Sequence, residues 1–120
     1  MDDNLNVQID DYRVFCQYGE LEYSFDEDTA IVNEISVYAK RSGIGTMLVE
    51  EFEKLACNES CRNVIVPASL SSEALSFWKS LGYKPMTVYD KRKMNRIIRS
   101  DSYPKWNDSQ GVIELQKQLS

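Results

Sequence analysis

Two glycines separated by one residue, Gly43 and Gly45, lie in the stretch 40–46, between a strand-like and a helix-like segment. Glycine has no side chain to keep a ligand away from the main chain, and the first amides of a helix have no partner inside it. Such amides bind phosphate, and Lys40 and Arg41 add positive charge beside them. The stretch therefore predicts a site for a nucleotide-like cofactor, or else only a tight connection between strand and helix.

Hydrophobic periodicity predicts the elements that hold this turn. Alternation with a period of two predicts antiparallel strands around residues 7–9, 14–16, 21–25 and 31–37. A stripe of apolar side chains then predicts a helix from Ile44, and the apolar run 63–66 predicts a buried strand after it. The order strand, helix, strand implies one parallel pair. The sequence therefore indicates an α/β domain.

The second half predicts fewer and shorter elements. A helix is expected from Ser71 or Ser72 to Gly82, because serine caps helix starts and glycine commonly ends helices. Segments 83–88 and 94–98 are predicted to form a closing pair of strands around a basic turn, 90–93.

The C-terminal residues show a weaker pattern. Residues 100–110 resemble a linker, and 112–119 are predicted to form a short terminal helix. We therefore expect a single domain over residues 1–99 and a C-terminal extension over 100–120.

Composition limits the class of protein. The chain has 120 residues, of which 42% are hydrophobic and 28% charged, as in soluble globular domains. No apolar run approaches the roughly 18 residues of a membrane span, and the acidic start, residues 1–4, differs from a secretory signal. We expect a cytoplasmic protein with no membrane partner.

Cysteine usage agrees with that expectation. Three cysteines form an odd set, which disfavours a disulfide framework and predicts free thiols at Cys16, Cys57 and Cys61. Cys57 and Cys61 could share a helix face, but two thiols in a chain without histidine make a poor zinc site, so no metal is expected.

Charge is unevenly distributed along the chain. The net charge of −5 argues against phosphate-backbone binding as the main activity, so a nucleic-acid partner is not expected. Residues 1–34 hold ten acidic side chains and one arginine, a net charge of −9, while residues 84–105 carry a net charge of +5. The acidic first third could attract a basic acceptor, or could simply keep the protein soluble.

Two separate segments resemble one known family. The stretch 34–48 resembles the cofactor motif of the GCN5-related N-acetyltransferases, and 71–83 resembles that family's late helix and the strand after it. The resemblance covers about residues 18–98. It implies a mixed, mostly antiparallel sheet with few helices and with a V-shaped splay between the motif strand and the following parallel strand.

The resemblance also implies how acetyl-coenzyme A is bound. The pantetheine arm would lie along the main chain of residues 35–37, and the amides of residues 41–46 would hold the pyrophosphate. Lys40 replaces the usual glutamine or arginine, Ser71 the asparagine that often opens the late helix, and Trp78 the tyrosine that often protonates the leaving thiolate. The full cofactor set is Ile35, Ser36, Val37, Lys40, Arg41, Ser42, Gly43, Ile44, Gly45, Thr46, Ser71 and Trp78.

The implied reaction is direct transfer of an acetyl group to a primary amine, with a protein lysine as the expected acceptor because the chain before the motif is short. The amine must lose a proton before it attacks, and histidine is absent, so Glu34 on the cofactor strand is the candidate base. Glu34 could equally be a solvent-facing sheet residue. Tyr38 and Tyr83 are further candidates, although aromatic residues on strands more often pack.

Two alternatives stay open from the sequence. A non-catalytic member would bind coenzyme A without turnover, which Trp78 at the usual tyrosine position favours. Alternatively, the basic segment 91–99 could serve a protein or nucleic-acid interaction module. The acceptor's identity and the oligomeric state, a homodimer included, are not determined by the sequence.

Overall fold

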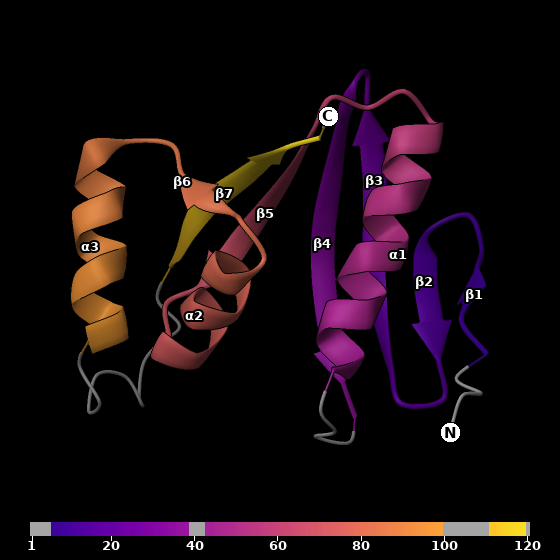
Figure 1. Ribbon diagram of the computed structural model, residues 1–120, viewed down its shortest axis with the longest axis horizontal. Coiled ribbons are helices and arrows are strands. Elements are labelled where there is room, and N and C mark those ends of the chain that lie inside the picture. The colour runs from indigo at the N-terminus through magenta and orange to yellow at the C-terminus, as the bar shows by residue number, and fades with distance from the viewer. Residues whose placement is uncertain (1–5, 39–42, 100–110, 120) are drawn as a thin grey trace. The chain divides into compact units, whose positions relative to one another are not determined.

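A computed structural model describes residues 6–38, 43–99 and 111–119. Within them, three helices and seven strands form a mixed α+β fold (Figure 1). The sheet is mostly antiparallel with one parallel pair, as the sequence predicted. Its strand order is β1-β2-β3-β4-β5-β7-β6. The elements are β1 (Gln8–Ile9), β2 (Arg13–Cys16), β3 (Gly19–Asp26), β4 (Thr29–Val37), α1 (Ile44–Asn58), β5 (Asn63–Ser69), α2 (Ser72–Ser80), β6 (Lys84–Pro85), α3 (Val88–Arg99) and β7 (Val112–Gln118).

The chain forms two compact units, Met1–Val64 with Gln118–Ser120 and Ile65–Lys117. In the first unit, β1 to β4 form an antiparallel meander, and α1 packs against β2, β3 and β4 (Figure 1). Tyr23 of β3 and Phe52 of α1 meet in its core, with their ring centroids 5.3 Å apart. The period-two strands and the helix from Ile44 are therefore confirmed.

The second unit contains α2, α3, β6, β7 and most of β5. Ser71 caps α2, because its Oγ accepts a hydrogen bond from the amide of Ala74 at 3.1 Å, as the sequence predicted. Gly82 follows the helix with a φ of 96°, a conformation that favours glycine. Buried side chains of this unit include Ile113 and Leu115 from β7, Met94 and Ile97 from α3, and Leu75 and Trp78 from α2.

The predicted closing pair of strands is wrong. Residues 88–99 form helix α3, and only Lys84 and Pro85 of the predicted first strand are extended. Met94 and Ile97, three residues apart, are buried together, which is the spacing of one helix face. Thr87 supplies the cap, since its Oγ1 accepts from the Asp90 amide at 3.0 Å. The supposed turn 90–93 has neither glycine nor proline and continues the helix.

The predicted C-terminal helix is also wrong, because Val112–Gln118 is strand β7. Its burial alternates: Ile113 and Leu115 are buried, while Val112 and Glu114 are exposed. That is the period of a strand with one covered face. β7 pairs with β6 through Lys84 opposite Gln116 and Pro85 opposite Leu115. The extension at the C-terminus thus contributes a strand of the sheet.

Candidate active site

β4 carries a β-bulge near its middle, at Asn33. Glu22 of β3 lies opposite Glu34, but the next residue, Tyr23, lies opposite Val32, so Asn33 has no counterpart. Ala30 and Val32 face the core, and regular alternation would bury residue 34 as well. The extra residue reverses the phase, and Glu34 is exposed. The bulge therefore turns a carboxylate outward on the strand that was predicted to hold the cofactor.

Glu34 lies on an acidic face of the first unit. Residues opposite one another in antiparallel strands point to the same side, so Glu34 shares a face with Glu22, and Ser36 shares it with Glu20. Ile35, opposite the buried Leu21, points toward α1 instead. The predicted strand residues Ile35, Ser36 and Val37 are all half-buried. Sequence reasoning did not identify the two β3 glutamates, because their pairing with β4 depends on the sheet register.

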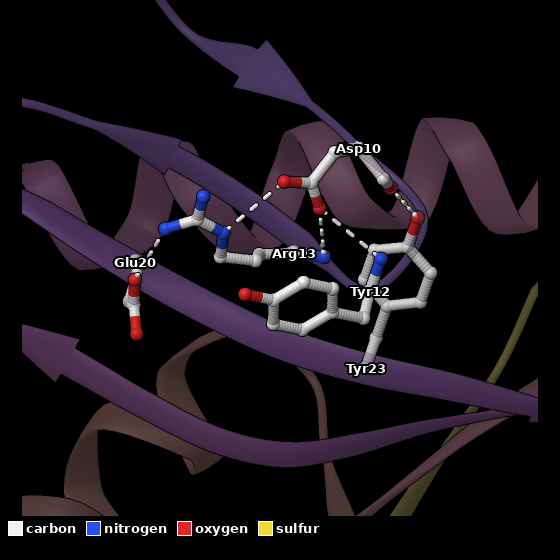
Figure 2. Close-up of polar contacts among 5 residues, drawn as sticks. All are labelled: Asp10, Tyr12, Arg13, Glu20 and Tyr23. Atoms are coloured by element: carbon white, nitrogen blue, oxygen red, sulfur yellow. Dashed lines mark hydrogen bonds and ion pairs between the residues drawn. The ribbon is translucent and has the colours of Figure 1, made fainter.

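Arg13 organises one edge of this face (Figure 2). Its Nε lies 3.2 Å from Asp10 Oδ2, and its Nη1 lies 3.1 Å from Glu20 Oε1. The guanidinium carbon also lies 4.0 Å from the centroid of the Phe15 ring, a cation–π contact. Arg13 therefore fixes the carboxylate that faces Ser36.

Asp10 closes the turn between β1 and β2. Its Oδ1 accepts hydrogen bonds from the amides of Tyr12 and Arg13 at 3.2 and 3.0 Å, and the Tyr23 hydroxyl donates to its main-chain carbonyl. Loss of hydration alone would raise the pKa of Asp10, but the two amides and the Arg13 guanidinium lower it below the ordinary value. The turn thus stabilises the ionised carboxylate.

The two tyrosines considered as bases are placed differently. Tyr38 follows β4 and is 63% exposed, and its main-chain amide donates to the Tyr18 carbonyl at 2.8 Å. Partial desolvation, followed by the negative charge of Glu20, raises the pKa of Tyr38, so the phenol stays protonated and is a poor base. Tyr83 is buried against Trp78, with ring centroids 5.0 Å apart. The exposed Glu34 is better placed to accept a proton.

The start of α1 provides the main-chain donors. Gly43 is the N-cap, with a left-handed φ of 88°, and no side chain caps the helix. The first helical bond runs from the Met47 amide to the Gly43 carbonyl at 2.9 Å, so the amides of Ile44, Gly45 and Thr46 precede the helical ladder. A Cβ at Gly43 would meet none of the described residues within 4 Å, and the first turn has no acidic residue. A helix start with open space and no nearby carboxylate in its first turn can accept a phosphate.

The remaining predicted cofactor residues divide into two groups. Lys40, Arg41 and Ser42 lie outside the described residues. Ser71 and Trp78 belong to the second unit, where Ser71 caps α2 and Trp78 is 3% exposed between Phe77 and Tyr83. This position makes packing the evident role of Trp78, and its contact with a cofactor stays a prediction.

Cys16, Cys57 and Cys61 are free thiols, as predicted, with Cys57 alone among them exposed. Burial raises the pKa of the Cys61 thiol, which keeps it protonated. Within the described residues, no group of three or more potential metal ligands occurs. No helix in the same residues has the length and apolar character needed to cross a membrane.

Comparisons of the whole chain give a clear answer at the level of structure. No protein-family model and no curated protein matches the sequence. The structure of GCN5 from Tetrahymena matches with a TM-score of 0.60 and 17% identity, covering 86% of this chain and 61% of that one. The N-acetyltransferase PaiA from Thermoplasma acidophilum, solved with coenzyme A, matches with a TM-score of 0.63 and 14% identity, covering 88% and 58%.

A smaller protein matches over more of its own length. The anti-CRISPR protein AcrVA5 has a TM-score of 0.58 and 17% identity, covering 85% of this chain and 94% of that one. The chain spans less than two thirds of the GCN5 and PaiA chains, and at these identities the likeness concerns the fold. The fold is that of the GCN5-related N-acetyltransferases.

Proposed function

We propose that this chain transfers an acetyl group from acetyl-coenzyme A to a primary amine, and that the amine is a protein lysine. The chain has the fold of the GCN5-related N-acetyltransferases. The observation that carries the proposal is the pair formed by consecutive elements: a bulged β4 that exposes Glu34, and an α1 that begins at Gly43 without a capping side chain. One supplies a proton acceptor and the other an anion site. Both would assist acetyl transfer from a pyrophosphate-containing donor to an amine.

The cofactor's anionic part would be held at the start of α1. The amides of Ile44, Gly45 and Thr46 would donate hydrogen bonds to phosphate oxygens, with the helix dipole adding to the attraction. The space beside Gly43 is open, since no described residue lies within 4 Å of the position that a Cβ would take there. When bound, acetyl-coenzyme A supplies the acetyl thioester, and the half-buried main chain of residues 35–37 would align it.

The acceptor must be deprotonated before it can attack. A lysine with a pKa of about 10.4 is some 3.4 units from neutrality, which corresponds to roughly 4.6 kcal/mol. The Glu34 carboxylate would accept a proton from the ammonium, directly or through water, and release it to solvent. Glu22 and Glu20, on the same face, would attract the cationic amine without taking part in proton transfer. The neutral amine would attack the thioester carbonyl carbon and form the amide bond, while the carbon–sulfur bond breaks and coenzyme A leaves as a thiolate. The proton that the nitrogen loses on forming the amide would reach the thiolate through water, and no covalent intermediate with the enzyme is needed.

A protein acceptor suits the molecule better than a small enclosed metabolite. The acidic face formed by Glu20, Glu22 and Glu34 matches a lysine and its basic neighbours. A non-catalytic coenzyme A-binding role remains the second candidate, since Trp78 is buried where many relatives place a tyrosine acid.

The test is acetylation of lysine-containing peptides by the purified protein, followed by mass spectrometry. Glu34→Gln should lower kcat/KM by about 10²–10⁴-fold, because a general base contributes that much. Glu22→Gln is the matched control, since it removes the same charge from the opposite residue and should change kcat/KM by less than about tenfold. Equal losses in both variants would remove Glu34 as the base. Turnover by neither variant nor the natural protein would leave the non-catalytic role.

A further inference from the structure

Helix α3 presents a basic face to solvent. Arg92, Arg96 and Arg99 are exposed, and their spacing of four and then three residues places them on one side of the helix. With a rise of 1.5 Å per residue, they follow the axis at intervals of about 6 and 4.5 Å. Lys91 borders the same side and is also exposed. The opposite side, with Met94 and Ile97, is buried.

We name the surface formed by Tyr89, Arg92, Arg96 and Arg99 the α3 face. Its arginines make no contact among the described residues that would give them a structural role. Within the described residues, none of the cations of α3 makes an ion pair. Like charges four residues apart on a helix oppose its formation by a few tenths of a kcal/mol. Arg92 and Arg96 are such a pair, so their charges are unfavourable for the isolated helix. A negatively charged partner would remove this repulsion.

The residue types on the face narrow the choice of partner. Guanidinium groups bind phosphate through two parallel hydrogen bonds, which lysine cannot do. Tyr89 lies one turn before Arg92 and is 72% exposed, so its ring is available for stacking on a base. Three arginines along one side of the helix, with an exposed aromatic ring one turn before them, can contact the phosphates and one unpaired base of a single strand.

We propose that the α3 face binds single-stranded nucleic acid, with Arg92, Arg96 and Arg99 on successive phosphates and Tyr89 stacked on a base. The chain's net charge of −5 limits the affinity but does not prevent binding, because residues 84–105 carry a net charge of +5 while residues 1–34 carry −9. The binding is sequence-tolerant and sensitive to salt. It is independent of acetyl transfer and needs no acetyl-coenzyme A.

The test is fluorescence anisotropy with labelled single-stranded DNA and RNA of about 20 nucleotides, a DNA duplex and poly-glutamate, from about 50 to 200 mM salt. The natural protein should bind the single strands with a slope of log K against log salt near −2, from about −0.7 for each of three phosphate contacts. Arg92→Gln with Arg96→Gln should reduce the slope to about −0.7 and weaken binding about tenfold or more at the lowest salt. Tyr89→Ala should weaken binding to single strands by at least about fivefold.

Lys79→Gln with Lys84→Gln is the control, because it removes the same charge from exposed positions outside α3. Glutamine keeps a good helix propensity, so α3 should form in both double variants, which circular dichroism verifies. Equal loss in the two double variants would show only a net-charge effect and overturn the proposal. Equal or tighter binding of poly-glutamate would assign the face to an acidic protein instead. Absence of binding to any strand at about 50 mM salt would also refute it.

Discussion

The first unit and helix α3 of the second unit place their cations in different ways. In the first unit, the described ion pairs involve Arg13, Lys54 and Arg62, each with a carboxylate from the same unit. Arg13 bridges two carboxylates and lies over an aromatic ring. In the second unit, the exposed arginines of α3 have no such partner among the described residues.

This difference separates charge used for structure from charge available to a partner. The side chain of Arg13 is 30% exposed, and it links the turn after β1 to the start of β3. Its contacts keep Glu20 in place on the acidic face (Figure 2). The α3 arginines fix nothing inside their unit, whose stability comes from buried apolar side chains. The variants below test each half of the comparison.

The largest expected effect concerns the apolar core of the second unit. Trp78→Ala removes a side chain that is 97% buried and contacts two aromatic rings, and should lower the free energy of unfolding by about 3–5 kcal/mol in urea titrations. Phe77→Ala, at a half-buried neighbour, should cost less. A loss below about 1 kcal/mol in Trp78→Ala would contradict the packing role and return Trp78 to the cofactor site.

A smaller effect is expected where two strands of the first unit meet closely. A Cβ at Gly19 would lie 2.7 Å from the main-chain oxygen of Ser36 and 3.2 Å from the Val37 Cα. Gly19→Ala should therefore destabilise the protein by about 1–3 kcal/mol through overpacking. Ser24→Ala, at an exposed position of the same strand, should stay within about 0.5 kcal/mol. Thermal unfolding of both variants would check this, and equal melting temperatures would refute the close approach.

Matched arginine variants test the comparison itself. Arg13→Gln should lower the melting temperature, because it leaves Asp10 and Glu20 without their shared cation. Arg96→Gln should change the free energy of unfolding by no more than about 0.5 kcal/mol, in either direction. Differential scanning calorimetry on the two variants decides the point. A larger destabilisation by Arg96→Gln would mean that the α3 charge is structural after all.

The smallest effect is a pH dependence at the β1–β2 turn. The pKa of Asp10 is lower in the folded protein than its ordinary value of 3.8, so the ionised carboxylate stabilises the fold above that value. This contribution is lost as the pH falls through the lowered pKa. The natural protein should therefore be more stable than Asp10→Asn at about pH 6, and the difference should shrink by about pH 2. A difference that stayed constant over this range would rule out the role of the charge.

Most of the fold could be predicted from local patterns. The four strands of the meander, the helix from Ile44 and the cap at Ser71 each have a periodicity or a residue type that specifies them. The prediction for residues 88–99 was wrong because the two ends of this segment were assigned to separate short strands. Val88 was placed in one strand, and Met94, Ile97 and Ile98 were placed in the other. Helix α3 depends on the burial of Met94 and Ile97. The sequence of this segment is rich in charged residues and does not indicate that burial.

The candidate site was predicted only in part. Gly43 and the end of β4 follow from residue types, but the outward direction of Glu34 depends on the bulge at Asn33. That bulge arises from the register of β3 against β4, and simple alternation would have buried Glu34. The glutamates of β3 joined the site for the same reason. The neighbours of a strand residue are set by pairing, which the local sequence does not specify.

Calorimetric titration with acetyl-coenzyme A tests the proposal that the main chain at the start of α1 binds the pyrophosphate. The natural protein should bind, and Gly43→Asp should abolish detectable binding, because its carboxylate would meet the phosphates. Gly43→Asn is the matched control, since asparagine tolerates the same left-handed φ of 88° and has no charge. It should retain much more of the affinity. No binding by the natural protein, or equal binding by folded Gly43→Asp, would contradict the account.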